Sequence, residues 1–183
     1  MQGKITSEEF KKYLDFAYGA YQENYISTPD QTYRQDGKVP YMMHPLWCAS
    51  MLITDTQVPW EQREIGFKAL ILHDVLEDTS LELPDWVEPE VRAVVKELTF
   101  KNQKQALREY ENKTPFIKLL MLYDELSSMY ENHVGVFNNA VMKKVKRKLW
   151  KEFTIKGIAE VEKEYGNIRI VQVGKAIVEN TKW

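Results

Sequence analysis

The chain has 183 residues, with a hydrophobic fraction of 44%, a charged fraction of 28% and a formal net charge of −2. This length suits one domain with a substantial core, and the composition excludes a disordered or fibrous chain. The near-neutral charge gives no electrostatic case for binding nucleic acid or a membrane surface. No run of about 18 apolar residues is present, as a membrane-spanning helix would require.

The compartment is indicated by cysteine usage and by the N-terminus. Cys48 is the single cysteine, so an internal disulfide cannot form, which is typical of a reducing compartment. The first residues, MQGKITSEEF, lack the apolar run of a signal peptide. We therefore expect a soluble, cytoplasmic protein.

Helical periodicity dominates the first part of the chain. A capping box, with Thr6 as the N-cap and Glu9 at the third helical position, opens a first helix expected over about 7–24. The following segment, 25–40, combines Pro and Gly with polar residues and predicts a loop. A second helix is expected over about 42–54.

Later segments also favour helices. The third helix should begin with Pro59 in its first turn and continue to Asp78. Further helices are expected over 91–98, over 103–111, from Thr114-Pro115 onward, over about 138–165 up to Gly166, and, as helix or irregular structure, over 168–178. The expected architecture is all-α and single-domain, spanning residues 1–183, with a core over about 7–131 and a C-terminal helical extension over about 136–183.

The segment ALILHDVLEDT, which contains His73 and Asp74, is the strongest functional signal. Polar groups built into an apolar helix are costly unless they are paired or coordinated. Adjacent helical residues point about 100° apart, so further ligands for one ion must come from other helices. His44 in YMMHPLW and Asp124 in LLMLYDELSSM are the candidates. A lone His-Asp pair occurs often by chance, so the prediction depends on the combination.

Two imidazoles and two carboxylates suit a divalent ion such as Mn²⁺, Fe²⁺ or Co²⁺, whereas Zn²⁺ prefers fewer ligands. Glu77 and Asp78 each follow a candidate ligand by four residues and so lie one turn along the same helix face. There a carboxylate can orient or deprotonate the attacking water. Phosphoester hydrolysis needs this combination of a Lewis acid and a proton acceptor.

These segments resemble the HD superfamily of metal-dependent phosphohydrolases, and most closely the hydrolase domain of RelA/SpoT-type alarmone enzymes and the small alarmone hydrolases. The shared segments are RQDGKVPYMMHPL, HDVLED and a later helix with a buried Asp, within about 10–131. The resemblance implies an all-helical fold, usually Mn²⁺, and removal of the 3′-pyrophosphate from guanosine tetra- or pentaphosphate. It also implies roles for seven residues. These are the metal ligands His44, His73, Asp74 and Asp124, the catalytic acids Glu77 and Asp78, and Arg34, which would pack on the guanine base.

The chain departs from the family in the helix that carries Asp124. Where the family has Lys, Arg, His and Asn, this chain has Met121, Glu125, Ser127 and Ser128. A glutamate in place of an arginine reverses a charge near the expected anionic substrate.

Several assignments therefore remain open. Lys118, which lies between the ligand segments, is a candidate phosphate contact. Tyr41 is expected to pack, although stacking or a hydrogen bond is an alternative. The expected function is metal-dependent hydrolysis of a phosphorylated small molecule, and a nucleotide is the expected substrate. The alternatives are an HD 5′-nucleotidase or other phosphomonoesterase, and a catalytically weak regulatory module that binds a nucleotide.

Overall fold

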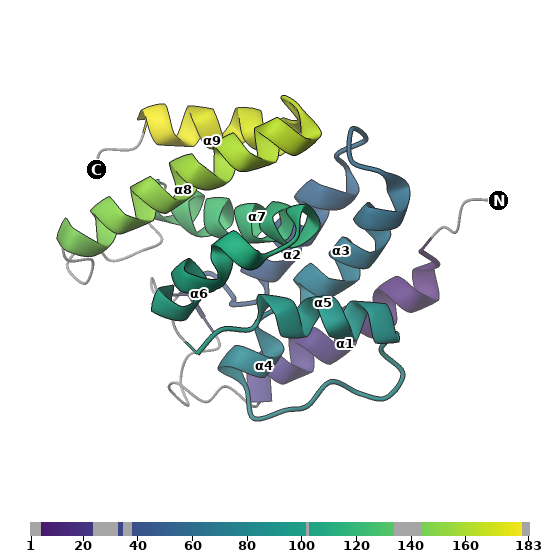
Figure 1. Ribbon diagram of the computed structural model, residues 1–183. Helices are drawn as coiled ribbons and strands as arrows, with labels where there is room; N and C mark the ends of the chain where they lie inside the picture. The colour runs from purple at the N-terminus through teal and green to yellow at the C-terminus, as the bar shows by residue number, and fades with distance from the viewer. Residues whose placement is uncertain (1–4, 24–32, 35–37, 102, 134–143, 181–183) are drawn as a thin grey trace.

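The computed structural model describes residues 5–23, 33–34, 38–101, 103–133 and 144–180 (Figure 1). Most of the predicted loop over 25–40 and the start of the predicted helix over 138–165 lie outside these residues. Helices account for nearly all of the regular structure described. They are α1 Ser7–Glu23, α2 Met43–Ile53, α3 Trp60–Leu72, α4 Val75–Asp78, α5 Pro89–Leu98, α6 Gln103–Glu109, the short 3₁₀ helix Tyr110–Asn112, α7 Pro115–His133, α8 Lys144–Tyr165 and α9 Arg169–Asn180.

The all-α, single-domain prediction is confirmed, and the helix ends form for the expected reasons. Thr6 Oγ1 accepts from the Glu9 backbone N–H at 3.1 Å, and Glu9 Oε2 accepts from the Thr6 N–H at 3.0 Å, which completes the capping box. Thr114 Oγ1 caps α7 by accepting from the Ile117 N–H at 3.3 Å. α8 ends at Tyr165, and the next residue, Gly166, has a φ of +77°, which favours glycine.

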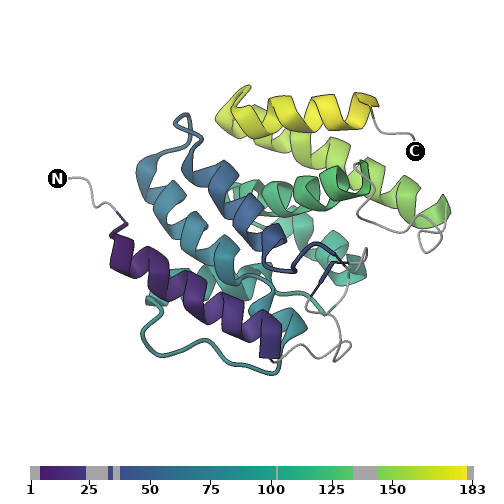
Figure 2. The same cartoon turned by 180° about the vertical axis from the view of Figure 1, so that it is seen from behind.

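The centre of the fold is α3, which packs against α1, α2, α5 and α7. Residues 66–72 are all buried, as expected for a helix with neighbours on every side. From behind, α1, α2 and α3 run side by side (Figure 2). This placement explains why the run Ala69–Leu72 is apolar throughout.

The last two helices lie over α7, on the opposite side of the molecule from α1 (Figure 1). They contribute buried side chains, such as Ile158 and Ile170, to the same apolar cluster as the earlier helices. The predicted division into a core over 7–131 and an extension over 136–183 stays a prediction.

The prediction of one continuous helix to Asp78 is wrong. α3 ends at Leu72, and α4 is a separate single turn that begins at Val75. His73 and Asp74 both keep right-handed helical backbone angles, but ψ of Asp74 is −5°, which redirects the chain. The His73 ring also takes the carbonyl oxygen of Leu70 as a partner at 2.7 Å, so a last-turn acceptor is satisfied by a side chain.

A candidate metal centre and its cavity

Three elements bring the four predicted ligands together. His44 lies in the first turn of α2, His73 and Asp74 form the turn between α3 and α4, and Asp124 lies within α7. His44 Nε2 is 3.0 Å from Asp124 Oδ1, and His73 Nε2 is 3.2 Å from Asp74 Oδ1. The crossed distances are 3.6 Å from His73 Nε2 to Asp124 Oδ1 and 3.7 Å from His44 Nε2 to Asp74 Oδ2.

These separations fit the ligands of one ion. Ligand atoms about 2.1 Å from an ion are about 3.0 Å apart when they occupy neighbouring octahedral positions. Both imidazoles present Nε2 to the centre and engage Nδ1 behind it. His73 Nδ1 is 2.7 Å from the Leu70 carbonyl oxygen, and His44 Nδ1 is 3.0 Å from Ser127 Oγ. Such outer contacts orient metal-binding histidines.

His73 Nε2 carries a further indication. This buried atom lies 3.2 Å from Asp74 Oδ1 and 3.6 Å from Asp124 Oδ1, but it forms no well-aligned hydrogen bond. That arrangement is costly for a polar atom unless a ligand satisfies it. The residues present therefore fit a divalent ion held by His44, His73, Asp74 and Asp124. Their role as ligands remains a prediction.

The electrostatics of the centre also favours a bound cation. Desolvation acts to raise the pKa of Asp124, but hydrogen bonds and charge from His44 and His73 outweigh it and hold that pKa well below its usual range. Desolvation acts to lower the pKa of His73, but the charges of Asp74 and Asp124 raise it to about 10. The metal-free centre thus keeps a proton on His73, where a metal ion would replace it.

Cys48 lies one helical turn after His44, and its ligand atom is within 4.8 Å of ligand atoms of His44 and Asp124. It is fully buried, and its thiol donates to the Tyr123 carbonyl oxygen at 3.6 Å. Burial, and then the charge of Asp124, raise the pKa of this thiol well above its usual range. We therefore describe Cys48 as packing beside the centre.

The two predicted acids flank the centre in different surroundings. Glu77 Oε2 accepts from the Phe100 backbone N–H at 3.1 Å, and desolvation raises the pKa of Glu77 to about 7. Desolvation and the charge of Asp74 raise the pKa of Asp78 to about 6. Carboxyls with pKa values near neutrality can accept and return a proton at physiological pH.

Tyr41 links this acidic group to Arg34. Its hydroxyl lies 2.7 Å from Asp74 Oδ2 and 2.5 Å from Asp78 Oδ2. The Arg34 guanidinium lies 5.1 Å from the centre of the Tyr41 ring. A pairing of Tyr33 with Pro40, in which the Arg34 N–H donates to the Val39 carbonyl at 2.7 Å, fixes this arrangement. The sequence left hydrogen bonding by Tyr41 as an alternative, and the structure shows it.

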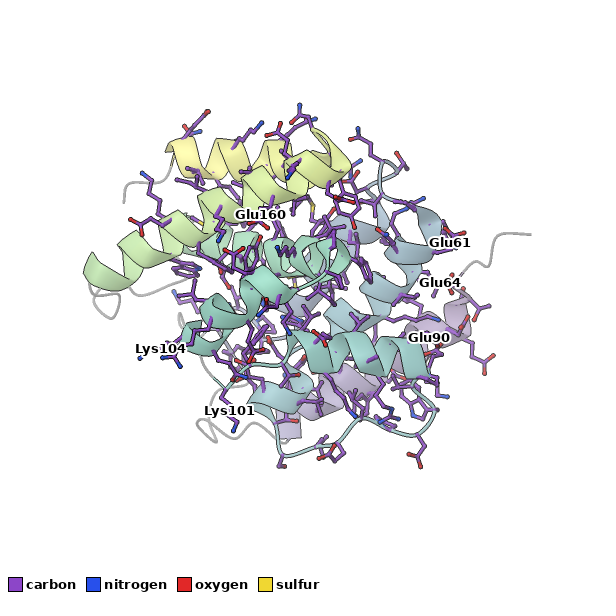
Figure 3. All side chains as sticks on the ribbon, in the orientation of Figure 1. Glu61, Glu64, Glu90, Lys101, Lys104 and Glu160 are labelled. Atoms are coloured by element: carbon purple, nitrogen blue, oxygen red, sulfur yellow. The ribbon has the colours of Figure 1, made fainter. Side chains whose placement is uncertain are left out.

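Beside the ligands lies a cavity of about 230 Å³. Glu77 lines it together with His73, Asp74 and Asp124. Leu98 of α5, Phe100 and side chains from α6, α7 and α8 form the remaining wall. Lys118 is not among the lining residues. Its ammonium group is paired at 2.6 Å with Glu160, which lies on α8 (Figure 3). The structure thus places Lys118 apart from the other predicted site residues.

Comparison with known proteins identifies the fold. No protein-family model matches the sequence, and no curated protein matches it significantly. Among solved structures, the chain matches a hydrolase with a TM-score of 0.74 and 20% identity over 97% of each chain. That structure is of a metazoan ortholog of SpoT, which hydrolyzes ppGpp and plays a role in starvation responses. The likeness confirms the predicted all-α, single-domain fold, which the chain shares with that hydrolase.

Proposed function

We propose that this chain is a divalent-metal-dependent phosphohydrolase that acts on a nucleotide. The observation that carries the proposal is the convergence of two imidazoles and two carboxylates beside a cavity that Glu77 also lines. A bound ion, for which Mn²⁺ suits the mixed nitrogen and oxygen ligands, would polarise the phosphoryl group and activate water. Glu77 would accept the proton of the attacking water, and Asp78 and Tyr41 would orient Asp74.

The sharpest form of the proposal is removal of the 3′-pyrophosphate from ppGpp. The fold likeness to a SpoT ortholog that hydrolyzes ppGpp supports it. Lys101 and Lys104 are exposed at the start of α6 (Figure 3) and lie within two residues of Phe100 and Ala106, which line the cavity, so they are better placed for phosphate than Lys118. A cytoplasmic location stays a prediction. Among the helices that the structure describes, none has the length and hydropathy of a membrane span.

A second candidate, a nucleotide phosphomonoesterase, is favoured by the wall of the cavity. Met121 and Glu125 line it, where the resembling family has Lys and Arg that would attract further phosphate groups. A module that only binds a nucleotide is less well supported, because it would not need a proton acceptor, and Glu77 and Asp78 are at positions suited to that role.

Product analysis of the purified protein with Mn²⁺ tests these forms. With ppGpp, we expect GDP and pyrophosphate only when metal is present, and their loss in Asp124→Ala. Release of orthophosphate from nucleoside 5′-monophosphates, with ppGpp intact, would assign the phosphomonoesterase instead. No turnover of either substrate with Mn²⁺, Fe²⁺ or Co²⁺ would refute the enzyme. A chelated sample is the control.

A further inference from the structure

The lining of the cavity combines two chemically different groups of side chains. One group is polar and consists of Glu77 with His73, Asp74 and Asp124. The other group, the aromatic wall, consists of Phe100 from the segment after α5 and of Trp150 and Phe153 from α8. A phosphate group loses hydration against aromatic rings without compensation, whereas a flat ring gains stacking contacts. The two groups therefore suit different parts of one ligand.

Contacts within the protein hold the side chains of the aromatic wall in place. Phe153 packs edge-on against Tyr110, with ring centres 4.9 Å apart. The ammonium group of Lys113 lies 5.1 Å from the centre of the Phe100 ring, and the Phe100 N–H donates to Glu77. Because these contacts fix the rings, a stacking ligand pays little to order them.

Among the described residues that line the cavity, Glu125 and Ser128 on α7 are the polar side chains outside the group of Glu77 and the candidate metal ligands. Glu125 Oε1 accepts from Thr154 Oγ1 at 3.1 Å, which holds the carboxyl group against the aromatic wall. Thr154 is itself buried, and its hydroxyl oxygen also lies 2.9 Å from the carbonyl oxygen of Trp150, one turn earlier in α8. A carboxyl group and a hydroxyl beside rings suit a planar ligand with a hydrogen-bonding edge.

We propose that the aromatic wall of the cavity binds the nucleobase, whose faces contact Phe100 and Phe153 and whose polar edge contacts Glu125 and Ser128. The placement of the phosphate beside His73 and Asp124 rests on the proposed function, but the base site does not. The volume of about 230 Å³ is below that of drug-sized sites and leaves room for a base with part of its sugar. The family resemblance implies instead that the base packs on Arg34. With the base on the aromatic wall, Glu125 is the residue that selects which base binds.

Binding of nucleosides to the chelated, metal-free protein tests the proposal without catalysis. Calorimetry measures the affinity of the protein for guanosine and adenosine, which carry no phosphate. These affinities are compared with that for ribose 5-phosphate, which carries no base. We expect at least one nucleoside to bind and ribose 5-phosphate to bind at least about tenfold more weakly, because base stacking on aromatic rings supplies most of the affinity. Quenching of tryptophan fluorescence that is lost in Trp150→Phe would locate the ligand.

Variants of the wall identify the contacts. Phe153→Leu keeps the apolar packing on Tyr110 but removes the ring, and Glu125→Leu removes the polar edge; each should weaken nucleoside binding about tenfold. Glu125→Gln retains both an acceptor for Thr154 and a polar edge, and should bind within about threefold of the parent. Tyr18→Leu, on the exposed face of α1, is the matched control. Circular dichroism and melting confirm that each variant is folded.

Equal binding of ribose 5-phosphate and nucleosides would overturn the base site. So would loss of nucleoside binding in Arg34→Ala with full binding in Phe153→Leu and Glu125→Leu. The proposed function fails separately. Nucleoside binding without metal-dependent hydrolysis of any phosphoester would uphold the base site and refute the enzyme, and hydrolysis without nucleoside binding would do the reverse.

Discussion

The hydroxyl group of Ser127 lies 3.0 Å from His44 Nδ1 and is buried behind the candidate metal ligands. When His44 Nε2 binds an ion, Nδ1 carries the proton and donates it to Ser127 Oγ. We expect Ser127→Ala to weaken Mn²⁺ binding by about 10- to 100-fold. Calorimetric titration checks this, with Ser50→Ala, an exposed serine on α2, the helix that carries His44, as the control. Equal Mn²⁺ affinity in both variants would contradict the role.

Single residues also show what the sequence could predict about the site. The four ligand candidates were predictable because their residue types are rare in apolar helices, and the structure brings their side chains within 3.0–3.7 Å of one another. The contact of Ser127 with His44 spans 83 residues, so no local pattern reveals it. Only its position between the ligand segments indicated Lys118 as a phosphate contact. Its pairing with Glu160 depends on how α8 packs, which the sequence near Lys118 does not show.

At the scale of elements, close approach of α3 to α2 and α7 depends on Gly66. A Cβ atom there would lie 2.5 Å from Leu52 Cδ2 and 2.9 Å from Leu120 Cδ2, and both leucines are fully buried. We expect Gly66→Ala to lower the free energy of unfolding by about 1–3 kcal/mol. Gly19→Ala, in α1 with no atom within 4 Å, should raise it by up to about 1 kcal/mol. Urea unfolding measures both, and a stabilised Gly66→Ala would show that α3 can move aside.

Lys68 joins three elements through carboxylates. Its ammonium group is 2.8 Å from Glu88 beside α5, 3.4 Å from Glu9 on α1 and 3.5 Å from Glu64 on α3. Because these carboxylates are partly exposed, we expect Lys68→Met to cost only about 1–2 kcal/mol at neutral pH.

That cost should depend on pH. Desolvation raises the pKa of Glu88, but hydrogen bonds from Lys68 and Tyr13 outweigh it and lower that pKa below 4.5. A carboxyl with a lowered pKa contributes stability above its unfolded pKa and loses it as the pH falls. The difference between parent and Lys68→Met should therefore shrink below about pH 4. Urea unfolding across this range measures it, and a constant difference would exclude Glu88 as the linked group.

The all-helical architecture of the whole molecule could be predicted, because the spacing of apolar residues, the helix caps and the helix-ending residues are local properties of the chain. The break between α3 and α4 at His73 and Asp74 could not be predicted, because both residues keep helical angles and the spacing of apolar residues continues through them. The packing of α8 and α9 on α7, and with it the aromatic wall of the cavity, depends on contacts between distant segments. Those contacts follow from the fold as a whole and leave no signature in either segment.

Metal binding should stabilise the entire fold, because its ligands come from α2, the α3–α4 turn and α7. A free ion at 100 times its dissociation constant contributes about 2.7 kcal/mol, which for a chain of this length raises the Tm by about 5–10 °C. In the metal-free protein, protonated His73, with its pKa raised to about 10, contributes stability that is lost as the pH rises. An ion needs the neutral ring and releases that proton. The rise in Tm with Mn²⁺ over chelator should therefore be larger near about pH 8.5 than near about pH 6.5. An equal rise in Asp124→Asn, or one that does not change with pH, would place the ion elsewhere.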